Sequence, residues 1–208
     1  MKSQLLLSVA LLVSAISGHA ATTLIGGSLL NGDFEVSTTG AVSFSSGTIA
    51  NWATWTEQST AAGDTGVYSS PTSGNRSAYL QPGAAIRDMT SYIIGQGDVL
   101  QYGFTDVLGA RPEATMFLIY EDAGAYLKIT GTDFTFATAS GANNTAITAP
   151  LFTVNAGDAW IGKTLGVGFT SAGSYPEIDN ANLAVIPEPS SAALLGLTGI
   201  ALVLRRRK

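Results

Sequence analysis

An alternation of apolar and small or polar residues, with a period of two, recurs in the middle of the chain and constrains its fold. In the segments Leu100–Phe104 and Leu165–Phe169, every second residue is a large apolar one. Successive side chains of a strand point to opposite faces, so each segment predicts a strand with one buried face. No segment between residues 21 and 186 keeps a helical period. We therefore expect an all-β domain there.

The rest of this region fits the same interpretation. Ala114–Tyr120 is almost continuously apolar, which predicts a strand covered on both faces, and the turn Asp122-Ala123-Gly124 predicts a hairpin to Tyr126–Thr130. Further strands are expected near residues 51–57, 78–81, 84–94, 134–138, 147–154 and 178–185. The chain has 24 glycines in 208 residues, which favours many turns. We predict a single antiparallel β-sandwich of jelly-roll type over residues 21–186.

The first 20 residues have the pattern of a signal peptide. Lys2 supplies the positive start, Leu5–Ile16 is apolar, and Gly18-His19-Ala20 places small residues before a cut after Ala20. The alternatives are a short buried helix or an uncleaved anchor. The apolar stretch is short for a membrane span, which favours the signal peptide.

The last 22 residues, 187–208, form a second hydrophobic segment. Pro187-Glu188-Pro189 precedes an uncharged stretch at residues 190–204, and Arg205-Arg206-Arg207-Lys208 end the chain. As a helix, the uncharged stretch would be about 22 Å long, short of the roughly 30 Å hydrocarbon core of a bilayer. We expect a short transmembrane helix whose cations stay in the cytoplasm, which leaves the preceding domain outside.

These three parts together, Pro187-Glu188-Pro189, the apolar stretch and Arg205-Arg206-Arg207, resemble the PEP-CTERM sorting signal of exported Gram-negative bacterial proteins. The resemblance implies processing by an exosortase-like membrane enzyme and delivery to the cell surface or extracellular matrix. It also implies a link to exopolysaccharide. An ordinary C-terminal anchor that happens to contain Pro-Glu-Pro is the alternative.

Charge and composition exclude several functions. Residues 21–186 hold fourteen acidic and five basic side chains, a formal charge of −9, which disfavours nucleic-acid binding. A divalent cation, a neutral polysaccharide or a cationic partner fits better. The chain has no cysteine, and its one histidine, His19, lies in the predicted signal peptide. Ser-His-Asp triads and Cys or His metal sites are thereby excluded.

Four short segments resemble galactose-binding-like jelly rolls, the fold of many carbohydrate-binding modules. They are Leu30–Glu35, Gly97–Tyr102, Trp160–Lys163 and Ile178–Leu183. The resemblance spans about residues 29–186 and implies a non-catalytic sugar-binding or structural role. Many such modules hold a structural calcium ion between carboxylates of the first and last segments, which are Glu35 and Asp179 here.

Strand periodicity adds to this calcium prediction. As a strand, Leu30–Val36 would place Glu35 on the face opposite Phe34, while Asp179 shares the parity of apolar Ala181 and Leu183. A carboxylate at the rim of a buried face is costly unless it is paired or bound to a metal. Calcium prefers oxygen ligands of this kind. The alternative is that both carboxylates cap turns or accept backbone amides.

Trp52 and Trp55 are the candidate ligand-binding residues. Residues three apart on a strand point to opposite faces, so at most one of these rings could stack on a sugar while the other packs inside. Four tyrosines are further candidates, namely Tyr68, Tyr79, Tyr126 and Tyr175. Core packing is the alternative role for every ring.

We assign no catalytic residue. The rival from another class is a secreted polysaccharide-active enzyme using carboxylates, for which the candidates are Glu57, Glu113, Glu121 and Asp122. A third possibility is a structural matrix protein that self-associates through divalent cations. The expected function is an exported, non-enzymatic, polysaccharide-binding or structural domain.

Overall fold

The computed structural model describes residues 20–36, 49, 51–55, 58, 65–68, 76–107, 114–135, 144–173 and 175–186. Side chains are described for all of these except residues 65–68. The predicted signal peptide, apart from Ala20, and the predicted sorting tail at 187–208 lie outside the described residues.

The described strands form two sheets. The seven-stranded sheet has the order β10-β6-β13-β4-β3, with β1 paired to β13 and β11 paired to β6. Its strands are β1 (Thr22–Ile25), β3 (Thr65–Tyr68), β4 (Ser77–Leu80), β6 (Val99–Asp106), β10 (Thr145–Thr148), β11 (Phe152–Thr153) and β13 (Glu177–Ile186).

The six-stranded sheet has the order β2-β5-β12-β7-β8, with β9 paired to β7. Its strands are β2 (Ala53–Thr54), β5 (Ala85–Ile93), β7 (Ala114–Asp122), β8 (Ala125–Lys128), β9 (Phe134–Thr135) and β12 (Thr164–Ser171).

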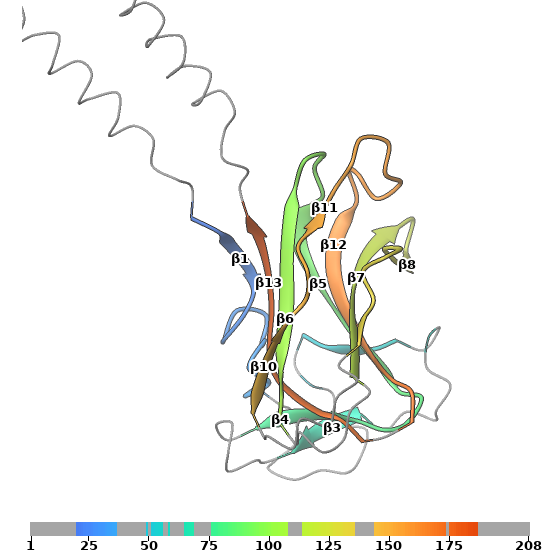
Figure 1. Ribbon diagram of the computed structural model, residues 1–208. Coiled ribbons are helices and arrows are strands. Elements are labelled where there is room, and N and C mark those ends of the chain that lie inside the picture. The colour runs from blue at the N-terminus through green and yellow to red at the C-terminus, as the bar shows by residue number, and fades with distance from the viewer. Residues whose placement is uncertain are drawn as a thin grey trace, which may run out of the picture.

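All strand pairs in the described residues are antiparallel. From β5 onward the chain crosses repeatedly between the sheets, with β5, β7 and β12 in one and β6, β10 and β13 in the other. The two layers stand face to face in Figure 1. This crossing pattern is that of a jelly roll, and the predicted all-β antiparallel sandwich is confirmed.

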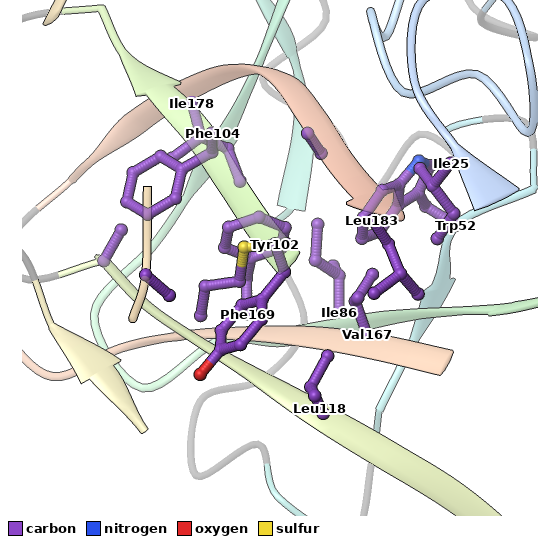
Figure 2. Packing of buried hydrophobic residues seen from close by; sticks show 14 of the residues in the cluster. Ile25, Trp52, Ile86, Tyr102, Phe104, Leu118, Val167, Phe169, Ile178 and Leu183 are labelled. Atoms are coloured by element: carbon purple, nitrogen blue, oxygen red, sulfur yellow. The ribbon is translucent and has the colours of Figure 1, made fainter. Parts of the chain in front are cut away.

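The main core fills the space between the sheets. In Figure 2 the side chains of Tyr102 and Leu183 from the seven-stranded sheet meet Val167 and Phe169 from β12. Phe104 packs edge-on against Phe169, with ring centroids 5.4 Å apart. The large residues at alternate positions of β6 and β12 therefore point inward, as the period-two pattern predicts.

Side chains of neighbouring strands also cover much of the outer face of the six-stranded sheet. The period-two pattern of β12 predicts only one buried face, so this second buried face was not expected. Gly166 and Gly168 occupy the outward positions of β12 and are buried. A Cβ on Gly168 would lie 2.5 Å from Cε2 of Phe117, and one on Gly166 would lie 2.4 Å from the Met89 sulfur. The glycines thus leave room for neighbouring side chains to lie across β12, which buries both faces of the sheet.

The strand β7 has two buried faces, as its continuous apolar sequence predicts. Met116 and Leu118 belong to the main core, whereas Phe117 and Ile119 form a second cluster with Trp55 and Ala85. The predicted hairpin to β8 is also present. Asp122 pairs with Ala125, and the two loop residues have positive φ, as in the tight turns that join antiparallel strands.

Several elements differ from the sequence predictions. The strands β1 and β3 were not predicted, and the expected strand at 147–154 is divided into β10 and β11. The segment Leu30–Val36 is a series of turns, and φ is positive at Leu30, Asn31 and Phe34. The period-two interpretation of this segment was therefore wrong: Asn31 is buried and Val36 is exposed.

Both ends of the described domain lie side by side. Thr22 at the start of β1 pairs with Val185 near the end of β13, and Figure 1 shows β1 (blue) beside β13 (red-brown) at one end of the sandwich. The start of β1 and the end of β13 are therefore adjacent.

We predict that Gly168→Ala destabilises the domain by about 1–3 kcal/mol, because the added methyl group would collide with the ring of Phe117. Gly95→Ala is the matched control, since its nearest contact would be an ordinary 3.4 Å to Asp98. Urea denaturation of both variants measures the difference. Equal stability of the two would contradict the close packing over β12.

Candidate functional site

The two segments of the predicted calcium site are in contact. The Ala181 backbone N–H donates to the Gly32 carbonyl at 2.8 Å, and a Cβ on Gly32 would lie 2.5 Å from the Ala181 carbonyl oxygen. The indole N–H of Trp52 donates to the Asn31 carbonyl at 3.1 Å and holds the same turn from the inside. The first and last parts of the domain are thus joined where β13 bulges next to Asn180.

The two predicted metal ligands have protein contacts at this junction. Oε1 of Glu35 accepts the Arg76 backbone N–H at 3.2 Å, and Nη1 of Arg76 donates to the Glu35 carbonyl at 3.0 Å. Asp179 is 1% exposed, and its Oδ1 accepts the Asn180 N–H at 2.6 Å. Both carboxylates are oxygen donors of the type calcium prefers, while the Arg76 cation beside Glu35 opposes a second positive charge.

No group of three or more acidic or histidine side chains in the described residues could hold a metal ion. A calcium ion at this junction would therefore need backbone carbonyl ligands in addition to Glu35 and Asp179. The calcium site stays a prediction.

We predict that calcium raises the melting temperature and that Asp179→Asn removes this effect, because the variant loses a negatively charged ligand. Asp133→Asn is the control, since Asp133 is exposed and pairs with Lys128. Thermal melts with calcium and with chelator provide the measurement. A midpoint that chelator leaves unchanged would rule the ion out.

The candidate tryptophans lie in different clusters, and both are buried. Trp52 is 4% exposed and packs in the main core against Phe34 and Phe169, with centroids 5.1 and 5.6 Å away. Trp55 is 0% exposed and packs against Phe117 at 5.7 Å. Neither ring presents a face to solvent in this structure.

The candidate tyrosines are placed differently from one another. Tyr79 is buried, Tyr175 is 50% exposed, and the side chain of Tyr68 is not among those described. Tyr126 is half-buried on the outer face of the six-stranded sheet, opposite Glu121 in the β7–β8 pair.

Around Tyr126 we define the outer shelf as Arg87, Phe117, Tyr126 and Lys128, together with the glycine floor of Gly166 and Gly168. The guanidinium of Arg87 lies 3.4 Å from the centroid of the Tyr126 ring. Nζ of Lys128 lies 4.2 Å from the Phe117 centroid and 2.6 Å from Oδ1 of Asp133. The outer shelf therefore combines an aromatic ring with two cations on a flat sheet face.

Sequence reasoning missed Arg87 and Lys128 as site residues. Arg87 lies on β5 and Tyr126 on β8, with β12 and β7 between them. Gly168 pairs with Arg87 in the sheet, and the Phe117 ring lies over Gly168, so the layer between β5 and β8 stays low beside the Arg87 side chain. The glycines at alternate positions of β12 were the one sequence feature that pointed to this surface. Their role can be recognised only when the strands beside β12 are known.

The cations of the domain gather on this sheet. Arg87, Lys128 and Lys163, three of the five basic residues between 21 and 186, lie in or directly beside its strands. The two lysines have carboxylate partners, because Lys163 pairs with Asp122 at 2.5 Å. Arg87 has no ion pair with any described residue, and its Nε is buried without a hydrogen-bond acceptor.

Asp88, next to Arg87 in β5, points to the other face of the sheet. It is 3% exposed, and its Oδ2 has no hydrogen-bond partner among the described residues. Burial raises the pKa of this carboxyl to about 7, while the Met89 backbone N–H and the Arg87 charge act in the opposite direction.

This pKa makes stability depend on pH. Between about pH 4 and pH 7 the folded state keeps the Asp88 proton and the unfolded state has lost it, so this group's contribution to stability falls across that range and is fully lost above about pH 7. We predict that Asp88→Asn raises the melting temperature by a few degrees more at pH 8 than at pH 5. Calorimetry at both pH values is the measurement, and an equal shift at both would contradict it.

A groove of about 660 Å³ lies at the edge of the sandwich between β1 and the end of β5. Its lining includes Leu24, Leu29, Leu30, Met89 and Ile93 and contains no charged side chain. The lining also includes Thr23, Thr90, Ser91 and Tyr92, so the groove is uncharged but of mixed polarity, unlike the outer shelf with its two cations.

The two described candidates for enzyme carboxylates, Glu121 and Asp122, do not form a pair on one surface. Glu121 and Asp122 are consecutive residues of β7 and so point to opposite faces. Asp122 is bound to Lys163. Glu57 and Glu113 lie outside the described residues.

The comparison with protein families matches residues 185–208 to the PEP-CTERM protein-sorting motif. The match begins inside β13 and contains Pro187-Glu188-Pro189 and the terminal arginines, so the prediction of this signal is confirmed. The motif indicates export and sorting to the cell surface and implies processing by an exosortase. Within the described part of the chain, no helix is long and apolar enough to cross a membrane.

No curated protein matches the sequence. Among solved structures, the CBM22-1 xylan-binding domain of Paenibacillus barcinonensis Xyn10C is similar at 11% identity and a TM-score of 0.47, over 82% of this chain and 98% of that one. A putative sugar binding protein from Bacteroides thetaiotaomicron is similar at 14% identity and a TM-score of 0.48, over 78% and 99%. At these values the likeness is one of general architecture.

Proposed function

We propose that this protein is an exported, non-catalytic sugar-binding domain whose binding surface is the outer shelf. The observation that carries the proposal is the stack of Arg87 on Tyr126, both partly exposed, above the packed layer in which Phe117 and Met89 cover Gly168 and Gly166. Sugar rings have apolar C–H faces and a rim of hydroxyl groups. A surface that offers aromatic carbon beside fixed hydrogen-bond donors suits both.

The polar groups of the outer shelf are held in place before a ligand arrives. Tyr126 orients the guanidinium, and Asp133 holds the Lys128 ammonium at 2.6 Å. Ordering side chains on binding costs free energy, so side chains that are already ordered favour affinity. The strand positions of Arg87, Tyr126 and Lys128 support this preorganisation.

Sorting of the protein to the cell surface fits a sugar-binding role. The start of β1 and the end of β13 lie side by side in the seven-stranded sheet, so attachment there would leave Arg87 and Tyr126 on the other sheet accessible. We propose that the domain binds polysaccharide at the surface or in the matrix of a Gram-negative cell, including its exopolysaccharide. The separation of Glu121 from Asp122 across two faces disfavours the glycosidase alternative.

We predict that Tyr126→Ala weakens polysaccharide binding about tenfold, because the ring and the orientation of Arg87 are both lost. Tyr175→Ala is the matched control, since Tyr175 is exposed away from the outer shelf. Isothermal titration with a polysaccharide panel gives the affinities, and thermal melts verify that both variants fold.

A turnover assay on the same panel separates binding from catalysis. Saturable binding without product supports the proposal. Product that disappears on mutation of a carboxylate would make the protein an enzyme, and calcium-dependent sedimentation without glycan binding would make it a self-associating matrix component.

A further inference from the structure

We infer that the sugar bound at the outer shelf is acidic, and that Arg87 binds its carboxylate. This inference rests on the proposed function and names the ligand class of the same site. Two observations support it: the guanidinium of Arg87 is held by the ring of Tyr126, and it forms no ion pair with a described residue.

The contact with Tyr126 uses the flat face of the guanidinium. With the ring centroid 3.4 Å from Cζ, the ring covers one face of the planar group and leaves the N–H bonds along its edge. Those edge donors match the two oxygens of a carboxylate, which an arginine binds through two parallel hydrogen bonds. The stack thus fixes the orientation of a carboxylate-binding fork.

Arg87 forms no ion pair with a described carboxylate. Lys128 has Asp133 and Lys163 has Asp122, whereas Arg87 makes no ion pair or side-chain hydrogen bond to any described residue. Its Nε is buried and has no acceptor among the described residues, so a ligand carboxylate would meet the two terminal amino groups of the guanidinium instead. None of the described acidic side chains forms an ion pair with this cation, so it can take an anion from a ligand.

Asp88, the acid next to Arg87 in the sequence, is not its ion-pair partner. Asp88 follows Arg87 in β5 and therefore lies on the inner face, while Arg87 lies on the outer face with Tyr126. The paired Lys128 and Asp133 offer hydrogen bonds next to Arg87 but little net charge. Glu121 also lies on this face, opposite Tyr126, but it forms no ion pair with Arg87. The guanidinium therefore remains available to a carboxylate of the ligand.

The test compares polyuronates with their neutral counterparts of the same linkage. Polygalacturonate and alginate are each titrated beside the carboxyl-reduced polymer, with the full domain in sodium buffer. We expect at least one acidic polymer to bind about 10- to 100-fold more tightly than its reduced form, as for a charge-assisted pair. Added salt should reduce this preference.

Two Arg87 variants and one control variant test whether Arg87 causes the preference for the acidic polymer. Arg87→Gln should abolish the preference for the acidic polymer. Arg87→Lys, which keeps the charge but loses the planar fork, should retain only part of it. Lys163→Gln removes a positive charge beside the same sheet that is already paired and should leave the preference unchanged. Thermal melts verify the fold, and Arg87→Lys keeps the test valid if Arg87→Gln is unstable.

The outcomes separate this inference from the proposed function. Equal binding of acidic and reduced polymers, or a preference that survives in both Arg87 variants, overturns the inference and leaves a neutral-sugar site standing. Failure to bind any polymer of either panel overturns both.

Discussion

The close approach of side chains over the two outward glycines of β12 is the constraint on which the rest of this structure depends. Phe117 and Met89 occupy the space that side chains at positions 168 and 166 would fill, so the six-stranded sheet is packed on both faces. The inner face contributes to the sandwich core. The outer face becomes a flat apolar layer, and Arg87 can extend across it to Tyr126. Packing and the candidate binding surface thus share one origin.

Charge is distributed unevenly over the domain, and its local arrangement matters more than its sum. A formal charge of −9 predicts a cationic or neutral partner, yet three of the five cations lie in or beside one sheet. Coulomb interactions in salt solution fade within about 10 Å, so a ligand on the outer shelf responds mainly to the groups beside it. An unpaired arginine on an acidic protein can therefore select an anion.

The junction of the first and last segments shows a different kind of constraint. The turn at Asn31 and Gly32 is held by β13 on one side and by Trp52 on the other. This contact places the beginning and end of the domain together, and the sorting motif begins directly after it. The start of β1 and the residues that lead into the sorting motif therefore lie at the same end of the domain.

The sequence by itself determined the antiparallel sandwich, the β7–β8 hairpin, the two-sided burial of β7 and the sorting motif, because each depends on neighbouring residues or on a period of two. Only the tertiary structure decided that Trp52 and Trp55 are both buried and that Leu30–Val36 turns back on itself. It also decided that Arg87 meets Tyr126, 39 positions further along the chain. Periodicity shows which face a side chain points to, whereas burial and pairing depend on which distant strands lie beside that face.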